Sequence, residues 1–209
     1  MAQESYDFSA VCESGQTLYY KITSSAEPYT VEVVQELDYY DDLTGNLIIP
    51  QYVAYNGKKY SVISIGDGTF NKCYSLISVT IPNSVISIGQ YAFNDCCGLK
   101  SIIIGDSVKS IGYSAFSLCV KLKSITIPNS VERIENNTFE DCSSLKSVII
   151  GNSVTSIGGA AFYGCKGLAS VNISDSVTEI GGGAFEGCKK LKKNIVKKIS
   201  EINENALGW

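Results

Sequence analysis

The stretch IPNSVISIGQYAFNDCCGLKSI, residues 81–102, decides the fold because its pattern returns along the chain. It has the apolar density of a core segment, yet it contains one proline, two glycines and two adjacent cysteines. Residues 104–125, IGDSVKSIGYSAFSLCVKLKSI, keep almost every apolar position of this stretch at a distance of 23 residues. We therefore interpret the stretch as one coil of a repeat.

Several kinds of residue recur with this period of 23 residues. The phenylalanine column is Phe70, Phe93, Phe116, Phe139, Phe162 and Phe185. Each Phe is preceded by an Ile five residues earlier and followed by a Cys three residues later and a Leu six residues later. A fixed period of about 20 to 50 residues is typical of solenoids, in which each unit buries its apolar side against its neighbours.

The sequence of each repeat predicts a coil with three short sides. Segments such as LISVTI alternate β-branched with small or polar residues, the pattern of a half-buried strand that places Val79 and Ile81 inside. A turn cluster such as PNS follows, then a second short extended piece, and AFNDC has the spacing of one helical or 3-10 turn. A column of glycines (Gly66, Gly89, Gly112, Gly158 and Gly181) is explained by positive φ or by tight backbone packing, and Glu135 interrupts it.

The sequence divides into three parts. Residues 1–60 do not follow the repeat, and YNGKKY predicts a type I′ hairpin around Asn56 and Gly57, so we expect a β-rich N-terminal cap. Residues 61–192 hold the repeats, and residues 193–209 form an atypical or truncated terminal coil. The predicted fold class is a solenoid of mixed α/β type: a β-rich right-handed superhelix with short helical or 3-10 turns.

The composition argues against several classes of protein. The formal charge is −4, the sequence pI is near 4.9 and 44% of the residues are apolar, as in a soluble globular chain. The chain has no histidine and no motif such as GxSxG or HExxH, so we expect no enzyme. Without clustered zinc ligands we expect no metal and no other cofactor. No membrane span and no nucleic-acid signature are found.

The cysteines follow the repeat rather than a disulfide framework. Six of the eight form the column Cys73, Cys96, Cys119, Cys142, Cys165 and Cys188. Equivalent residues on adjacent coils lie close enough for a bridge, but their side chains point in parallel, so we favour buried free thiols over disulfides. Cys12 and Cys97 lie outside the column, and their pairing would require the cap to fold back over the second coil.

One outward-facing column and its neighbour are candidates for binding. The outward column is Thr80, Ile103, Thr126, Ile149 and Asn172, and the neighbouring lysine column is Lys100, Lys123 and Lys146. A generic soluble sheet surface explains these residues as well. The binding interpretation is a surface of small hydroxyls, isolated isoleucines and a stripe of positive charge.

The unit IPNSVxxIGxxAFxxCxxLxSI resembles the 23-residue leucine-rich repeat of BspA-like surface proteins over residues 61 to about 192. Serine stands where the general leucine-rich pattern has its asparagine ladder, so the turn hydrogen bonds should differ. The resemblance implies a leucine-rich-repeat solenoid at the cell surface or secreted, with a non-enzymatic role in adhesion to an extracellular or host protein or a glycan. The alternative is a structural spacer of a larger surface protein. A signal peptide pattern is absent from the N-terminal residues, which leaves secretion open.

Overall fold

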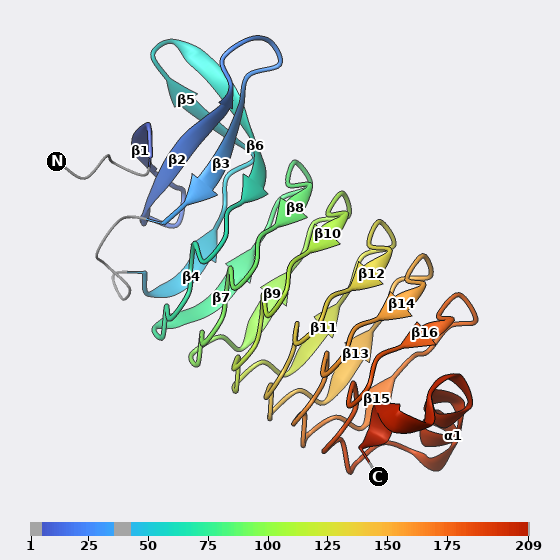
Figure 1. The fold of residues 1–209 in the computed structure, drawn as a ribbon. Coiled ribbons are helices and arrows are strands. Elements are labelled where there is room, and N and C mark those ends of the chain that lie inside the picture. Colours follow the sequence, from blue (N-terminus) through green and yellow to red (C-terminus); the bar gives the residue numbers. More distant parts are fainter. Residues whose placement is uncertain (1–5, 36–42, 209) are drawn as a thin grey trace, which may run out of the picture.

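The computed structural model describes residues 6–35 and 43–208, which form a stack of coils between a β-rich end and a helical end (Figure 1). The β-rich end contains β1 (Phe8–Val11), β2 (Thr17–Ser24), β3 (Thr30–Val34), β4 (Gly45–Ile48), β5 (Tyr52–Tyr55) and β6 (Lys58–Ile65). The coils contain β7 (Leu76–Thr80), β8 (Ser87–Ile88), β9 (Ser101–Ile103), β10 (Ser110–Ile111), β11 (Ser124–Thr126), β12 (Arg133–Ile134), β13 (Ser147–Ile149), β14 (Ser156–Ile157), β15 (Ser170–Val171) and β16 (Glu179–Ile180). The helical end contains α1 (Lys193–Ile202) and the 3-10 helix η1 (Glu204–Leu207).

Two columns of parallel strands enclose the core. The first column runs β4, β7, β9 and then β11, β13, β15, and the second runs β6, β8, β10 and then β12, β14, β16. Pairs such as Ser78↔Ser101 and Ser64↔Ser87 join residues 23 positions apart, so the sequence period is the strand register. Val79 and Ile81 are buried as predicted, each with an exposed fraction of 1%. The solenoid expected from the repeat is therefore confirmed.

The N-terminal segment supplies the first strand of both columns. β1, β2 and β3 are antiparallel neighbours, β3 lies parallel to β6, and β6 continues into the second column beside β8. The predicted hairpin is confirmed: β5 and β6 pair antiparallel, with φ of 48° at Asn56 and 72° at Gly57. Those two positive φ values are what a type I′ turn requires.

The loop after β1 covers the open edge of β4. The Ile48 N–H donates to Oγ of Ser14 (3.0 Å), and Nε2 of Gln16 donates to the carbonyl oxygens of Thr44 (2.9 Å) and Asn46 (3.0 Å). An uncovered edge strand presents unpaired backbone groups to other chains. These bonds therefore complete the first coil.

At the other end, the atypical terminal coil extends the hydrogen-bond ladder. Gly183 and Phe185 donate their N–H groups to the carbonyls of Asn205 (2.9 Å) and Ala206 (2.8 Å), as each earlier coil does to the next. Helix α1 buries Ile199 against the last coil. The last repeat is thus covered by an atypical terminal coil, which still follows the repeat after a deletion of one residue. Its apolar residues stand 22 positions after their equivalents in the preceding coil: Ile199, Ile202, Ala206 and Leu207 follow Val177, Ile180, Ala184 and Phe185.

The third side of each coil is built from tight turns. In the second coil the Cys96 N–H donates to the Phe93 carbonyl (3.3 Å), the bond that a 3-10 turn would have. Tyr91 and Asp95 have φ of 55° and 57°, and such left-handed residues prevent a helix from continuing. In the described residues, α1 and η1 are the only helices. The segments of the coils expected to be helical or 3-10 are therefore single hydrogen-bonded turns and not helices.

The core is a stack of phenylalanine rings beside a stack of thiols. Neighbouring rings from Phe70 to Phe185 lie 5.0 to 5.5 Å apart, and all six are buried. The thiol of Cys119 donates to the Phe93 carbonyl of the preceding coil (3.2 Å), and Cys96, Cys142, Cys165 and Cys188 make equivalent bonds. The cysteines therefore link coils by hydrogen bonds as well as filling space.

Close packing, and not positive φ, explains the glycine column. A Cβ at Gly112 would lie 2.6 Å from the Gln90 backbone nitrogen, and one at Gly181 would lie 2.4 Å from that of Gly159. No real Cβ comes so near, so a side chain there would push the coils apart. Positive φ occurs two residues later instead, at Tyr91, Ser114, Asn137 and Ala160.

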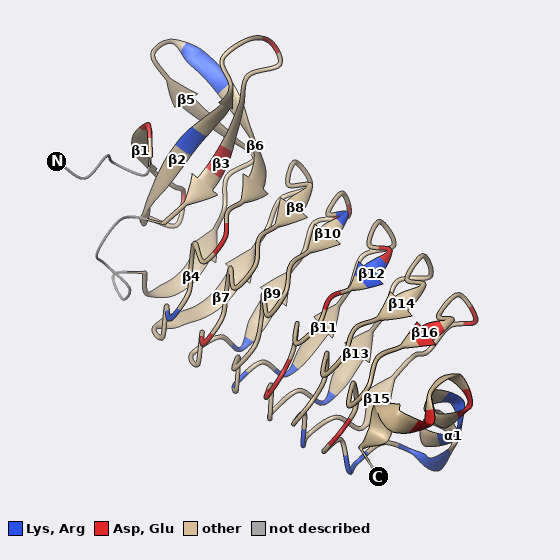
Figure 2. Ribbon diagram, in the orientation of Figure 1, with Lys and Arg blue, Asp and Glu red and all other residues tan. Residues whose placement is uncertain are grey.

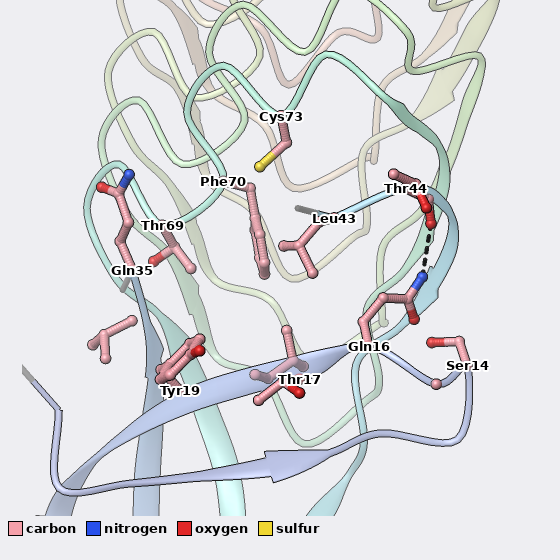
Figure 3. Close-up of a pocket in the computed structure, with 13 residues that line it drawn as sticks. Ser14, Gln16, Thr17, Tyr19, Gln35, Leu43, Thr44, Thr69, Phe70 and Cys73 are labelled. Carbon is pink, nitrogen blue, oxygen red and sulfur yellow. Dashed lines mark hydrogen bonds between the residues drawn. The ribbon is translucent and has the colours of Figure 1, made fainter. Parts of the chain in front are cut away.

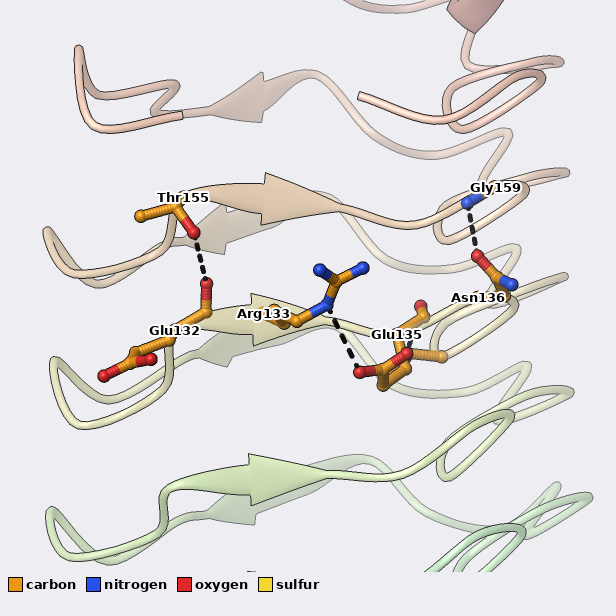
Figure 4. A network of polar contacts seen from close by, with 7 residues as sticks. Glu132, Arg133, Glu135, Asn136, Thr155 and Gly159 are labelled. Carbon is orange, nitrogen blue, oxygen red and sulfur yellow. Dashed lines mark hydrogen bonds and ion pairs between the residues drawn. The ribbon is translucent and has the colours of Figure 1, made fainter. Parts of the chain in front are cut away.

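Both strand columns are interrupted between the same two coils, and in the second column Glu135, the residue that interrupts the glycine column, lies at the break. Regular strand pairing stops between β9 and β11 and between β10 and β12, and Ile102 and Ile104 are each 8% exposed beside this opening. Glu135 bears the Cβ that Gly112 and Gly158 lack, and it pairs with Arg133 at the exposed surface (3.5 Å) rather than entering the core (Figure 4). We infer that this side chain prevents regular pairing of β10 with β12, while the third side of the coils stays bonded across the break through the Phe116 N–H and the Thr138 carbonyl (2.9 Å).

Replacing Glu135 by Gly should let the opened ladder close. Each restored backbone hydrogen bond contributes about 0.5–1.5 kcal/mol, so amide exchange in residues 132–135 should slow roughly five- to tenfold. Hydrogen exchange measured by mass spectrometry tests this, with Glu132→Gly as the control in the same coil but outside the column. Equal exchange in both variants would show that Glu135 does not cause the opening.

Candidate binding face

The outward side of the first strand column, here called the sheet face, carries the candidate residues. Ile103 and Ile149 are exposed by 65% and 59%, whereas Ile102 and Val148 beside them are buried. The alternation follows from the strand pleat, which sends successive side chains to opposite faces. The structure thus places the predicted outward column on the surface.

The sheet face begins one strand earlier than the repeat pattern predicts. Ile48 of β4 pairs in register with Thr80 of β7, which pairs with Ile103 of β9, and Ile48 is 42% exposed. A signal for this strand is present in the sequence, because Ile48-Ile49-Pro50 matches Thr80-Ile81-Pro82. It is easily missed, since the rest of the cap does not follow the period.

Asn172 differs from the other members of its column. Its Oδ1 accepts the Ile150 N–H (2.6 Å) and its Nδ2 donates to the Ile150 carbonyl (2.9 Å). The side chain therefore takes the place of a strand residue at the end of the short β15. Asn172 lies on the sheet face, but its amide is engaged in holding the last coils together.

The lysine column runs along the start of the strands. The Lys123 N–H donates to the Lys100 carbonyl (3.3 Å) and the Lys146 N–H donates to that of Lys123 (2.8 Å), so the three residues follow one another coil by coil. All three are exposed, and none has an ion pair within the described part of the chain. Salt screens such charges, but they remain available to an anionic partner.

A second concentration of lysines lies around α1 (Figure 2). Lys198 pairs with Asp175 (2.7 Å), which lowers the pKa of that carboxyl, and Lys197 pairs with Glu201 (3.6 Å). Acidic residues are interleaved with these lysines along the end of the solenoid. This arrangement is a mixed, solvated end and not a continuous positive surface.

All eight cysteines are free thiols, including Cys12 and Cys97. The thiol of Cys12 contacts Ser14 (3.1 Å) and Gln16 (3.6 Å) in the cap, whereas that of Cys97 donates to Asp95 (2.9 Å). Burial raises the pKa of the Cys142 thiol from 9.0 to about 12, and partial burial together with Asp95 raises that of Cys97 to about 11. Burial also raises the pKa of the Cys96 and Cys119 thiols, and a hydrogen bond with Cys188 together with burial raises that of Cys165. Thiolate chemistry is therefore suppressed at these four column residues and at Cys97.

Thiol labelling checks this assignment. At pH 8 the unreduced, denatured chain should react with eight equivalents, and native protein with about one or fewer. The protein should also lose stability at high pH. Unfolded thiols ionise near pH 9.0, whereas burial keeps Cys142 neutral to a pKa of about 12, so the free energy of unfolding should fall as the pH rises from 9.0 toward 12. Finding three or four disulfides by mass mapping would contradict the free column.

A hollow of about 490 Å³ lies between the cap and the first coil (Figure 3). It is lined on one side by Thr69, Phe70 and Cys73 and on the other by cap residues that include Gln16 and Leu43. Residues 36–42, which connect Gln35 to Leu43 at its rim, lie outside the described part of the chain. We therefore assign no ligand to this hollow.

Comparison with known families decides the identity of the repeat. The model of the BspA type leucine rich repeat region matches residues 63–192 in 6 copies. The chain belongs to this family. Every candidate residue of the sheet face except Ile48 lies within the matched BspA-type repeats. No curated protein matches the chain.

Solved structures of leucine-rich repeat proteins are similar to this BspA-type chain in fold. A leucine-rich repeat protein of T. pallidum is 27% identical with a TM-score of 0.69, over 89% of this chain and 93% of that one. A leucine rich cell surface protein of Faecalibacterium prausnitzii is 29% identical with a TM-score of 0.61, over 90% of this chain but only 54% of that one. A leucine-rich repeat protein of Bacteroides ovatus is 25% identical with a TM-score of 0.50, over 89% of this chain and 81% of that one.

The described residues of this BspA-type chain contain no helix long and apolar enough to cross a membrane. They also contain no group of three or more His, Cys, Asp or Glu side chains placed to hold a metal ion. What the repeats offer chemically is a rigid surface of hydroxyl, aliphatic and ammonium groups.

Proposed function

We propose that this chain is a non-enzymatic binding protein of the bacterial surface, secreted or attached, which adheres to an extracellular or host protein or to a glycan through the sheet face. The observation that carries the proposal is the exposure of Ile103 and Ile149, at 65% and 59%, on the outward side of two consecutive hydrogen-bonded sheets. Large aliphatic side chains presented this way gain free energy when a partner removes them from water. The fold alone does not identify the partner.

Charge supports the same face. Lys100, Lys123 and Lys146 stand beside the isoleucines without ion pairs among the described residues, so they would raise the association rate of an acidic partner. The cell-surface description of the F. prausnitzii relative supports the location. Membership of a repeat family, together with the lack of histidine, argues for binding rather than catalysis.

The proposal is tested by binding the purified protein to a panel of extracellular-matrix proteins and glycans. Lys100→Glu/Lys123→Glu/Lys146→Glu should weaken binding most at low ionic strength, and Ile103→Ser/Ile149→Ser should weaken it at every ionic strength. Neither change should unfold the protein, because the side chains point outward.

The opposite strand column provides the matched control. Ile86, which is 44% exposed, and Lys109 lie on that side, so Ile86→Ser and Lys109→Glu should leave binding unchanged. Unchanged affinity in the sheet-face variants would remove this face as the site. A chain that binds nothing in the panel and tolerates all substitutions would fit the spacer role instead.

A further inference from the structure

The exposed isoleucines of the sheet face are spaced by two coils, a feature that points to a particular partner. Ile48, Thr80 and Ile103 lie opposite one another on three consecutive strands. Strands lie about 4.8 Å apart, so Ile48 and Ile103 are separated by about 9.6 Å along the solenoid. Thr126 and Ile149 repeat the alternation in the next sheet. Apolar contact is therefore offered once per two coils, with a hydroxyl between.

Regular chain conformations differ in how often a side chain returns to the same side. In an extended strand, side chains on the same side are roughly 6.6–6.8 Å apart, and in an α-helix a side chain on the same side recurs after two turns, about 10.5 Å along the axis. A polyproline II chain has three residues per turn and a rise of about 3.1 Å, so every third residue returns at about 9.3 Å. Its mismatch with the isoleucine spacing is about 0.3 Å, against about 0.9 Å for a helix.

The polar groups between the isoleucines suit the same conformation. Within the described chain, the hydroxyls of Ser101, Ser124 and Ser147 have no hydrogen-bond partner; Ser124 and Ser147 lie opposite each other on paired strands, and Ser101 holds the equivalent position on the other side of the break. A polyproline II backbone makes no internal hydrogen bonds and leaves its N–H and C=O groups available. The serine row is therefore placed to bond the backbone of a chain that runs along the solenoid.

The lysine column adds a charge requirement. Lys100, Lys123 and Lys146 lie one residue before these serines, at the border of the sheet face. A peptide seated on the isoleucines would direct its carboxylates toward these ammonium groups. We propose that the sheet face binds an acidic polyproline II segment of a partner protein, with an apolar residue at every third position. This inference rests on the proposed function and specifies its partner.

Synthetic peptides test the conformation. The probe is a labelled peptide of about thirteen residues with four Leu at every third position and Pro and Glu elsewhere, and the control has the same composition with its four Leu at every fourth position. Fluorescence anisotropy should give an affinity about tenfold higher for the period-three peptide, lost in the triple Lys→Glu variant. Equal affinity for both peptides, or no binding of either, would overturn the inference.

A variant of unchanged composition tests the spacing. Ile103→Thr/Thr126→Ile keeps one isoleucine and one threonine but replaces the two intervals of two coils between exposed isoleucines by intervals of three coils and one coil. Binding of the period-three peptide should fall about tenfold, whereas Ile86→Thr/Thr155→Ile, the same exchange on the opposite strand column, should have no effect. No loss in the first variant would overturn the inference.

The two levels of the proposal fail differently. Suppose that the isoleucine and lysine variants lose binding of a ligand from the screen. If the spacing variant still binds that ligand, or if the ligand is a glycan, then the sheet face is the binding site and the polyproline II inference is wrong. If the opposite-face variants alone reduce binding, the proposed function of the sheet face is wrong as well.

Discussion

Phe116→Ala should lower the free energy of unfolding by about 3–5 kcal/mol, the cost of truncating a fully enclosed aromatic side chain. Phe116 is completely buried, and its ring stacks between Phe93 at 5.3 Å and Phe139 at 5.5 Å. The coil cannot collapse into the space, because its backbone is bonded to both neighbours through the Phe93 N–H and the Thr138 carbonyl. Both stacking contacts are lost together with the buried area.

Urea unfolding followed by circular dichroism measures this effect. Tyr113→Ala in the same coil is the control, because that ring is 37% exposed and its loss should cost less than about 1 kcal/mol. A cost below ~1 kcal/mol for Phe116→Ala would mean that the phenylalanine column does not hold the solenoid together.

Deleting residues 1–60 should abolish soluble folding. The deletion removes β4, which pairs with β7, and β3, which pairs with β6, so the first coil loses a neighbour in both strand columns. Leu47, Ile49 and Val62 are buried at this junction. In a solenoid each coil is stabilised by its neighbours, and an uncovered end exposes apolar surface and unpaired strand edges.

Size-exclusion chromatography with light scattering of a fragment starting at Ser61 tests this expectation. The fragment should aggregate, whereas the full chain with Val11→Ser, a change at a residue that is 70% exposed in the cap, should remain soluble and monodisperse. A soluble fragment that unfolds cooperatively would show that residues 1–60 do not protect the repeats.

The period of 23 residues is sufficient to predict the repeating part of the fold. Neighbouring coils contact one another through equivalent positions, so a column in the sequence is also a column in space. For this reason the periodicity alone predicts both the burial of Phe116 and the exposure of Ile103. The hairpin at Asn56 and Gly57 is equally predictable, because the turn type depends on those two residues alone.

Only the tertiary structure decided where the repeat is interrupted and how it ends. The cap supplies Ile48 and the first strands through pairings that do not follow the 23-residue period. The exposed residue Asn172 also bonds the backbone of the preceding coil, which its position in the repeat does not predict. Glu135 is visible in the sequence as an exception, but its consequence depends on how closely the coils pack, since a Cβ at the equivalent Gly112 or Gly158 would lie 2.6 Å from a backbone nitrogen of the preceding coil. Periodicity reports which residues meet, whereas the distance at which they meet is set by the packing of the whole coil.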